Sequence, residues 1–311
     1  MNELDRSEIP MNKTVCISGA NGFLGEAIVR KLQDNGYQIL ALTRNLDGID
    51  FSKKVSTTKY VAGDLSVWCS AILDFEPKIV ISCDWQGVSG EARSNEDQNN
   101  NIERIKKLAD TAREIEAKTF LTFGSQAEVA PSFDLIGENV EDSSQDLYGT
   151  AKASLRKVLS ESLSDSNTKL IWGRIFTIYG PGDVRNSIIV NGIKSFLNHE
   201  NFEVVSGSRK WSFLYIDDFA NAILKILESE DLPEVVNIGN PDSVKLSSVK
   251  NEINEILEFQ MHQFSEPKPE NPKPDLTWIP QTTTLSALGW KPQISFHYGM
   301  EKTIAWWRLN V

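Results

Sequence analysis

Short runs of apolar and β-branched residues alternate along the chain with segments whose apolar residues recur at helical spacing. The first two such runs, residues 13–18 and 38–43, predict strands. Between them, apolar residues from Phe23 to Leu32 follow a helical period, and Gly36 then ends the predicted helix. This region therefore predicts one strand–helix–strand unit.

The same alternation continues to about residue 180. Further strands are predicted at residues 59–61, 78–82, 119–123 and 170–176, and helices at about 101–115 and 148–160. Strands that alternate with helices are typical of a parallel sheet with helices on both faces. We therefore predict an α/β fold built on a doubly wound parallel sheet.

After Pro181 the pattern changes. Helices are predicted at about 187–197 and 217–227 and in a C-terminal segment that ends in Trp306 and Trp307, and strands at 202–205 and 235–238. These pieces predict a smaller lobe that is interleaved with the sheet. The expected division is a disordered leader over residues 1–12, a sheet domain over 13–180 with parts of 205–240, and a C-terminal lobe mainly over 181–311.

Composition and charge narrow the class of protein. The chain has 311 residues and a formal net charge of −11, which argues against a general nucleic-acid binder. It has no run of about eighteen apolar residues, and its N-terminal segment lacks the basic flank and apolar core of a signal peptide. We therefore expect a cytoplasmic protein without a membrane partner. The cysteines Cys16, Cys69 and Cys83 have no metal-ligand spacing, so no metal site is predicted.

A glycine-rich turn follows the first predicted strand. Small residues at this place allow a tight turn, let a pyrophosphate approach the backbone and let the helix pack on the strand. The N-terminus of the next helix would then face the anion. A simple packing turn is the alternative. The candidate dinucleotide-binding residues of this turn are Gly19, Asn21, Gly22, Phe23, Leu24 and Gly25.

The second predicted strand ends in Thr43, Arg44 and Asn45, where an NAD enzyme commonly carries an acidic residue for the ribose hydroxyls. The Arg44 guanidinium can instead pair with a 2′-phosphate, which predicts NADP(H) as the cofactor. A solvated surface arginine is the alternative. After the third strand come Asp64 and Leu65, and the Asp64 carboxylate could hydrogen-bond the adenine amine or simply cap the next helix.

Tyr148 and Lys152 are four residues apart, so they share one face of a predicted helix. A lysine near a phenol stabilises the phenolate, lowers the tyrosine pKa and makes the phenol a usable acid or base. Ser125, at the end of a predicted strand, can donate a hydrogen bond to the same substrate oxygen. Each residue alone is a weak signal, but together they predict a catalytic set.

In this order, the motifs resemble the extended short-chain dehydrogenase/reductase family, the group of nucleotide-sugar epimerases, dehydratases and reductases. The resemblance covers nearly the whole chain after residue 12. It also rests on four later segments, Arg174-Ile-Phe-Thr-Ile-Tyr-Gly-Pro-Gly182, Phe213-Leu-Tyr-Ile-Asp-Asp218, Asn237-Ile-Gly239 and Leu288-Gly-Trp-Lys-Pro292. It implies a Rossmann domain for the cofactor and a C-terminal lobe for a nucleotide-diphosphate sugar.

The resemblance also implies roles for single residues. Tyr148 would exchange a proton with the sugar oxygen, Lys152 would also hold the nicotinamide ribose, and Ser125 would orient the carbonyl. Further cofactor contacts are expected from Cys83, Asp84, Trp85, Phe123, Phe176 and Ile178. Substrate contacts are expected from Trp85, Ser125, Gln126, Thr177, Asn186 and Trp211. Arg185 and Arg209 can bind the diphosphate, because an arginine fork matches phosphate oxygens, and a solvated surface arginine is the alternative for each. Family members often pair through two helices, here those at about 101–115 and 148–160, so a homodimer is expected.

The chain departs from the family pattern at three places. Sugar dehydratases usually have Thr-Asp-Glu where this chain has Ser125-Gln126-Ala127, so the carboxylates that eliminate water are missing. Glu128 is the nearby acid, and we interpret it as a solvated loop residue. Thr177 and Trp211 stand where family members often have Asn and Arg. The Trp211 indole can stack on a nucleobase or sugar ring, or it can belong to the core.

Without an elimination apparatus, a ketoreductase that consumes NADPH and a C4-epimerase that retains NAD are the two main reactions. Arg44 favours the reductase, because epimerases of the family mostly retain NAD. We therefore predict NADPH-dependent reduction of a 4-keto-6-deoxy sugar nucleotide to a deoxy or dideoxy product. The alternatives are the epimerase, a reductase of a small carbonyl compound, and a non-catalytic protein that senses NADP(H) on the same fold.

Overall fold

The computed structural model describes residues 13–47, 49, 56–95, 97–200, 202, 210–257 and 276–310. The predicted leader over residues 1–12 and the candidate residue Arg209 lie outside this part, as does most of the strand predicted at 202–205. Contacts divide the chain into two compact units. Unit 1 consists of Met1–Trp85, Asn99–Phe123 and Ser154–Trp172, and unit 2 of Gln86–Gln98, Gly124–Ala153 and Gly173–Val311. The domain bounds expected from the sequence stay a prediction.

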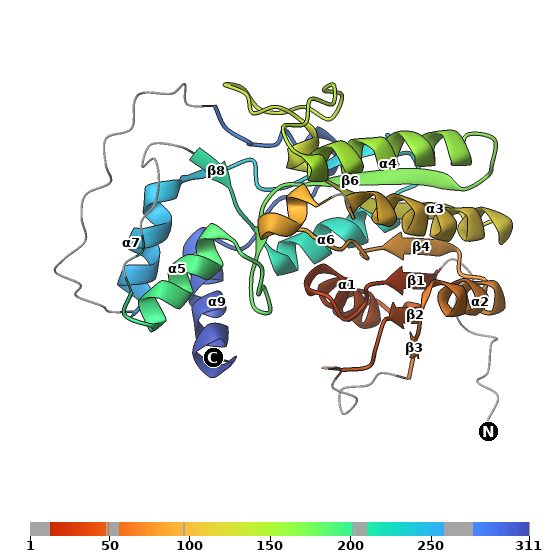
Figure 1. Cartoon of the computed structure of the whole chain (residues 1–311), viewed down its shortest axis with the longest axis horizontal. Helices are drawn as coiled ribbons and strands as arrows, with labels where there is room; N and C mark the ends of the chain where they lie inside the picture. The colour runs from red at the N-terminus through yellow and green to blue at the C-terminus, as the bar shows by residue number, and fades with distance from the viewer. Residues whose placement is uncertain are drawn as a thin grey trace. The chain divides into compact units, whose positions relative to one another are not determined.

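Seven strands form one sheet in the order β10-β6-β5-β4-β1-β2-β3. They are β1 (Thr14–Ser18), β2 (Gln38–Thr43), β3 (Thr58–Ala62), β4 (Ile79–Ser82), β5 (Thr119–Ser125), β6 (Lys169–Ile175) and β10 (Val235–Ile238). Strand β1 pairs in parallel with both β2 and β4, so that Cys16 is in register with Leu40 on one side and Val80 on the other. The parallel pairing continues to β3 and β5. The strand order therefore reverses beside β1, as Figure 1 shows, which confirms the doubly wound sheet.

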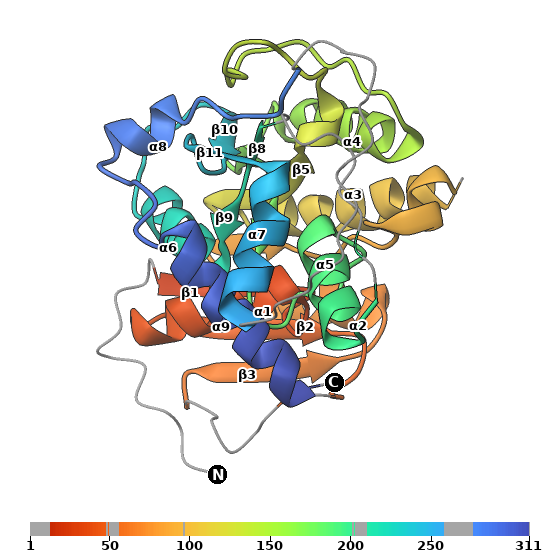
Figure 2. The same ribbon diagram turned by 90° about the vertical axis from the view of Figure 1, so that its left-hand side faces the viewer.

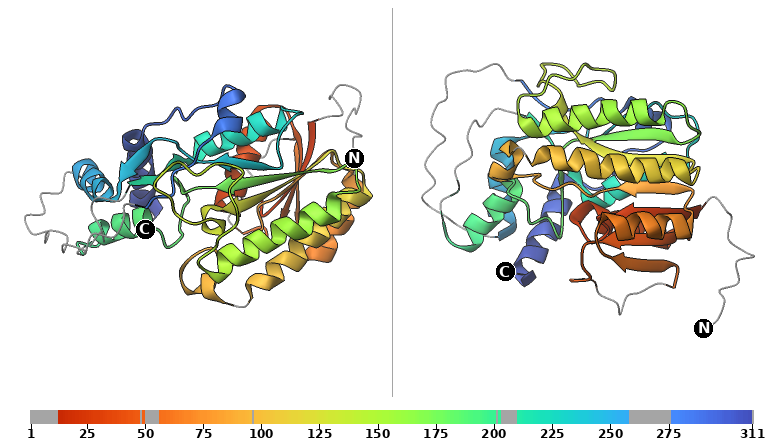
Figure 3. Two further views of the ribbon diagram at one scale, coloured as in Figure 1. Left: turned by 90° about the horizontal axis from the view of Figure 1, so that it is seen from above. Right: turned by 45° about the vertical axis from the view of Figure 1, so that its right-hand side comes forward.

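Helices connect these strands and cover the sheet. They are α1 (Phe23–Asp34), α2 (Leu65–Phe75), α3 (Gln98–Glu114), α4 (Leu147–Leu163) and α6 (Ile216–Leu227). Figure 3 shows α3 and α4 side by side, and the Ser162 hydroxyl of α4 donates to Asp110 of α3 at 2.8 Å. Both faces of a parallel sheet are covered, so all three residues Val15–Ile17 of β1 are fully buried.

Unit 2 adds short strand pairs and further helices. Strand β7 (Ile178–Tyr179) pairs in parallel with β9 (Leu214–Tyr215), and β8 (Lys210–Ser212) pairs antiparallel with β11 (Ser243–Lys245). Helices α5 (Ile188–Leu197), α7 (Leu246–Leu257) and α9 (Phe296–Asn310) contact one another, as Figure 2 shows, and α8 (Thr283–Ala287) is one short turn. Among the described residues, no helix has the length and apolar character needed to cross a membrane.

The predicted elements that fall on described residues are present near their expected bounds, but several elements were missed. Helix α7 buries Leu246, Val249, Ile253 and Leu257, a helical spacing that the sequence did contain. Strands β7 and β9 have two residues each, and β8 and β11 have three. Runs this short carry no period, so they can be recognised only once their pairing partners are known.

Candidate active site

The glycine turn lies in unit 1 between β1 and α1, and its geometry demands small residues. Gly19 has a φ of +69°, a left-handed conformation that glycine adopts at no steric cost. The Gly22 amide donates to the Gly19 carbonyl at 3.0 Å. A Cβ on Gly25 would lie 2.1 Å from that same carbonyl oxygen. The turn therefore exposes backbone at the start of α1, and the Gly22 cap of this helix makes no side-chain hydrogen bond.

The segment after β4 packs directly against this turn. A Cβ on Gly19 would lie 3.0 Å from the Cys83 carbonyl group, and the Cys83 amide donates to Ser18 at 3.0 Å. Asp84 is buried and accepts from Arg104 Nε at 2.6 Å, while Arg104 Nη2 donates to the Asp84 carbonyl at 3.1 Å. Unit 1 thus brings Gly19, Cys83 and Asp84 together, and Trp85 follows them half-buried.

The end of β2 forms a second side of this cofactor region. The Thr43 hydroxyl donates to the Asn45 carbonyl at 2.6 Å and the Trp68 indole donates to the Thr43 carbonyl at 3.1 Å, which fixes the turn. Arg44 and Asn45 are exposed at its tip. The fixed turn thus leaves the Arg44 side chain accessible to a ligand.

Asp64 follows β3 and caps the next helix, which was the alternative to an adenine contact. Its carboxylate accepts from the Ser66 amide at 2.9 Å and the Val67 amide at 3.1 Å, so it caps α2, which begins at Leu65. Hydrogen bonds from the Ser66 side chain and from these two amides hold the pKa of Asp64 below its usual range. An adenine contact from Asp64 stays a prediction.

The predicted catalytic residues lie together in unit 2. Tyr148 is buried at the second residue of α4 and is hydrogen-bonded to the Ser125 side chain. A Cβ on Gly149 would lie 2.1 Å from the Ala127 carbonyl oxygen. The start of α4 therefore packs on the backbone that follows Ser125. Lys152 is also buried, with its Nζ 5.8 Å from the centre of the Tyr148 ring.

The pKa of Tyr148 differs from the sequence-based expectation. Burial raises the pKa of the phenol above its usual value, and the charge of Glu128 adds to this. The Ser125 hydrogen bond and the positive charges of Arg93 and Arg185 act in the opposite direction. The sequence predicted a lowered pKa from Lys152 alone; in the folded chain desolvation outweighs the favourable charges.

Glu128 corrects a second expectation, because it is not a solvated loop residue. Its side chain is fully buried in the short 3₁₀ helix η4 (Gln126–Glu128) and accepts a short hydrogen bond from the Ser125 amide. Its other oxygen lies 3.4 Å from Nε of Arg174, which is also fully buried. Arg174 in turn contacts Asn237 at 3.4 Å. The Ser125 amide is therefore hydrogen-bonded to a carboxylate that belongs to a buried ion pair. The sequence alone did not indicate this pair.

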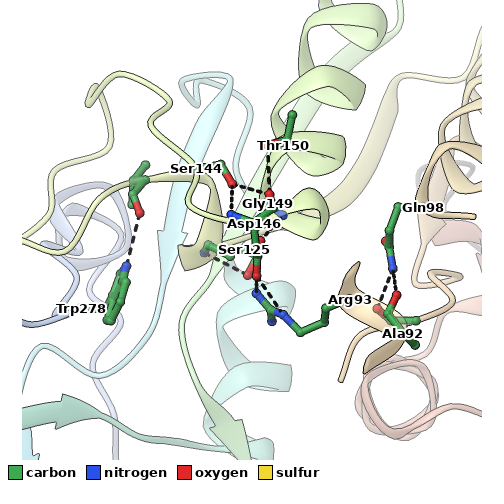
Figure 4. A network of polar contacts seen from close by, with 12 residues as sticks. Ala92, Arg93, Gln98, Ser125, Ser144, Asp146, Gly149, Thr150 and Trp278 are labelled. Atoms are coloured by element: carbon green, nitrogen blue, oxygen red, sulfur yellow. Dashed lines mark hydrogen bonds and ion pairs between the residues drawn. The ribbon is translucent and has the colours of Figure 1, made fainter. Parts of the chain in front are cut away.

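Sequence analysis also missed Arg93. This residue lies in the 3₁₀ helix η3 (Gly90–Ser94), with its guanidinium 4.3 Å from the centre of the Tyr148 ring. Its Nη2 lies 2.5 Å from Asp146, the residue just before α4 (Figure 4). No local pattern could have revealed this contact, because Arg93 and Asp146 are 53 positions apart in the chain.

Three of the expected substrate residues make contacts within unit 2. Arg185 pairs with Asp183 at 2.7 Å and donates to the Ile178 carbonyl at 2.7 Å. The Trp211 indole donates to the Thr177 hydroxyl at 2.6 Å, and its ring centre lies 5.2 Å from that of Trp278. Trp278 was not singled out from the sequence. Both indoles are half-buried, which allows a ligand contact as well as a core role.

The remaining expected residues are placed as follows. Asn186 is exposed and accepts from Asn191 at 2.6 Å, and Gln126 is half-buried in η4. Phe123 is buried in β5 of unit 1. Phe176 and Ile178 are buried after β6 in unit 2.

Comparisons with known proteins now bear on this geometry. Residues 15–239 match the model of the NAD dependent epimerase/dehydratase family. The chain belongs to this family. A nicotinamide dinucleotide is the typical cofactor of the family, and a glycine turn such as Gly19–Gly25 after a first strand fits it.

Two curated relatives of this epimerase/dehydratase chain are similar over nearly its whole length. GDP-L-fucose synthase 1 of Arabidopsis thaliana is 23% identical, with 96% of this chain and 94% of the relative covered. dTDP-D-glucose 4,6-dehydratase of Homo sapiens is 23% identical, with 96% and 89% covered. A similar solved structure is that of UDP-N-acetylglucosamine 4-epimerase from Methanobrevibacter ruminantium M1 in complex with UDP-N-acetylmuramic acid. Its TM-score is 0.84 at 21% identity, and the match covers 96% of this chain and 99% of the epimerase chain. The last likeness confirms the fold.

Proposed function

We propose that this chain reduces a 4-keto-6-deoxy sugar, linked to a nucleotide diphosphate, with NADPH as the reductant. The observation that carries the proposal is the hydrogen bond between Ser125 and the buried phenol of Tyr148, with Lys152 buried on the same helix. The two relatives and the similar solved structure are all named for a nucleotide-linked sugar. These names support the substrate class.

The residues of unit 1 fit a dinucleotide. Gly25 and Gly22 leave the room that a Cβ would fill next to the Gly19 carbonyl, so the backbone can approach a pyrophosphate. Arg44 is exposed at the end of β2, where its guanidinium can bind a 2′-phosphate bidentately. This placement supports NADPH over NADH. When bound, the nicotinamide supplies the hydride for the carbonyl carbon.

The residues of unit 2 carry the proton transfer. Tyr148, whose pKa is raised by burial, holds its proton at working pH and can therefore donate it to the carbonyl oxygen of the sugar. The Ser125 hydroxyl can donate a hydrogen bond to the same oxygen and orient it. The ammonium of Lys152 stabilises the phenolate that remains after the proton has left.

The side chains around Ser125 support reduction rather than dehydration. Removal of water from a sugar needs an acid and a base besides the tyrosine, and Gln126 and Ala127 supply neither. Glu128 could have filled this role. Both of its oxygens are instead occupied by the Ser125 amide and Arg174.

A homodimer through α3 and α4 stays a prediction.

The proposal is tested by following the absorbance of NADPH with a panel of 4-keto-6-deoxy sugar nucleotides that carry different bases, with NADH in parallel. Oxidation of NADPH by one of them, faster than of NADH, is the expected result. Formation of a C4-epimer from an unmodified sugar nucleotide, without net oxidation of NADPH, would show an epimerase instead. Binding of NADPH without any turnover would favour the sensor.

Tyr148→Phe separates catalysis from folding. The phenyl ring keeps the packing but has no proton to donate, so we expect kcat to fall roughly 10²- to 10⁴-fold. Tyr298→Phe is the matched control, because Tyr298 is exposed on α9, and its kcat should equal that of the wild type. Thermal unfolding of both variants should match the wild type. An active Tyr148→Phe variant would contradict the assignment of Tyr148 as the proton donor.

A further inference from the structure

A second cation besides Lys152 lies near the Tyr148 ring, and it comes from a segment of unit 2 that is distant in the sequence. The Arg93 guanidinium lies over the ring face at 4.3 Å from its centre, within the range of a cation–π contact. Lys152 Nζ is further from the same centre, at 5.8 Å. Arg93 is therefore the nearer of these two charges.

Arg93 is held in this position by the start of the helix that carries Tyr148. Its Nε and Nη2 donate to one oxygen of Asp146 at 3.1 Å and 2.5 Å. The other oxygen of Asp146 accepts from the Gly149 amide at 2.7 Å, which ties the carboxylate to the first turn of α4. Figure 4 shows Arg93 in contact with Asp146 at the start of this helix. Asp146 therefore fixes both the cation and the helix end beside Tyr148.

The segment that carries Arg93 is also fixed from its other side. The amide of the buried Gln98 donates to the Gly87 carbonyl at 2.8 Å and to the Ala92 carbonyl at 2.7 Å. Gly87 has a φ of +75°, and a Cβ there would lie 2.6 Å from Gln98 Nε2. Gln98 thus holds the backbone on the N-terminal side of Arg93 at two points. Arg93 therefore contacts the phenol from a backbone that is fixed by hydrogen bonds.

We propose that Arg93 is a positioning residue for Tyr148. Its guanidinium holds the Tyr148 ring in place and stabilises negative charge on the phenol oxygen. This inference rests on the proposed function, in which Tyr148 donates its proton and becomes a phenolate. The proton passes to the carbonyl oxygen of the substrate, and the charge left on the phenolate is partly delocalised into the ring that the Arg93 guanidinium covers. A phenolate makes the ring face more negative, which strengthens the contact with the cation.

The groups around Tyr148 show why a further cation matters. Burial opposes ionisation of the phenol, and the charge of Glu128 from η4 adds to this. Three groups partly offset this rise in the pKa of Tyr148. They are the Ser125 hydrogen bond, Arg93 from η3 and Arg185 from the loop before α5. Arg185 is already paired with Asp183. Arg93 is the cation of this pair that stacks on the ring itself.

The Arg93–Asp146 pair is half-buried, with side chains 32% and 33% exposed, and Asp146 also accepts from the first turn of α4. A merely structural role predicts that removal of the pair changes stability and leaves the titration of the phenol unchanged. A positioning role predicts a shift in the titration of the phenol.

The test replaces Tyr148 with a difluorinated tyrosine in the full chain, with and without NADPH. The ring fluorines lower the pKa of the phenol and give a fluorine NMR signal for this phenol alone. In the Arg93→Met variant we expect the titration midpoint to rise by about one pH unit, because a cation next to the phenol is lost. Arg93→Lys should give an intermediate midpoint. Arg113→Met removes a more exposed arginine, which pairs with Asp110 in unit 1, and should leave the midpoint unchanged.

An unchanged or lower midpoint in Arg93→Met would overturn the proposal, as would an equal shift in Arg113→Met. The native tyrosine provides the second readout. With Arg93→Met, kcat should fall on its plateau and its alkaline limb should move to higher pH, since a weaker acid keeps its proton longer. The two proposals can be separated. A shifted midpoint in a protein that oxidises no NADPH would keep the Arg93 contact and reject the reductase, whereas turnover with an unshifted midpoint would keep the reductase and reject Arg93.

Discussion

The glycine turn of unit 1 and the polar cluster around Tyr148 in unit 2 differ in the contacts that hold them. Within the turn, Gly22 and Gly25 lie against the carbonyl of their close neighbour Gly19, and the backbone of Cys83 packs on the same residue. The cluster is held by pairs that are far apart in the chain, since Glu128 and Arg174 are separated by 46 positions. A substitution in the turn should therefore act locally on the cofactor. A substitution in the cluster should act on the fold and on catalysis together.

The largest effect is expected from breaking the buried ion pair. Arg174→Met leaves the Glu128 carboxylate uncompensated in the interior, and we expect a loss of about 3–5 kcal/mol in the free energy of unfolding, measured in urea. The double variant Arg174→Met with Glu128→Leu removes both charges and should recover much of this loss. If Arg174→Met unfolds like the wild type, the pair does not support Ser125 and the contrast between the two regions fails.

A smaller effect is expected from crowding the turn. In Gly25→Ala the added methyl meets the Gly19 carbonyl oxygen, a backbone atom that must shift, and we expect a cost of about 2 kcal/mol. Calorimetric titration should show that NADPH binding is weakened as well. Gly137→Ala is the control, because its Cβ would have no atom nearer than 3.5 Å. Equal behaviour of the two variants would contradict the close approach seen at Gly25.

The smallest effect is expected at the exposed end of β2. Arg44→Ala should weaken NADPH binding by about 1.5 kcal/mol, roughly tenfold, and leave NADH binding unchanged, because only the 2′-phosphate contact is lost. The exposed Arg30 of α1 provides the control Arg30→Ala, which should bind both cofactors like the wild type. Equal losses for NADPH and NADH would show that Arg44 does not read the phosphate.

The sequence by itself determined the doubly wound sheet and the glycine turn. Both depend on local features, namely the spacing of apolar residues and the need for glycine where a Cβ would meet backbone. The spacing of Tyr148 and Lys152 also placed both on one helix face, because the spacing on a helix is fixed, whereas the order of motifs in the family linked Ser125 to them. Even the cap at Asp64 was visible as an alternative, since its partners are the next residues.

Only the tertiary structure decided what surrounds that cluster. The sequence indicated a solvated loop residue at Glu128, whereas in the structure Glu128 is buried against Arg174. Nothing in the sequence indicated Arg93, which the structure places over the Tyr148 ring. The direction of the Tyr148 pKa changed for the same reason, since desolvation depends on how completely the folded chain covers the phenol. Burial and ion pairing arise when distant segments meet, and no local pattern of residues records that meeting.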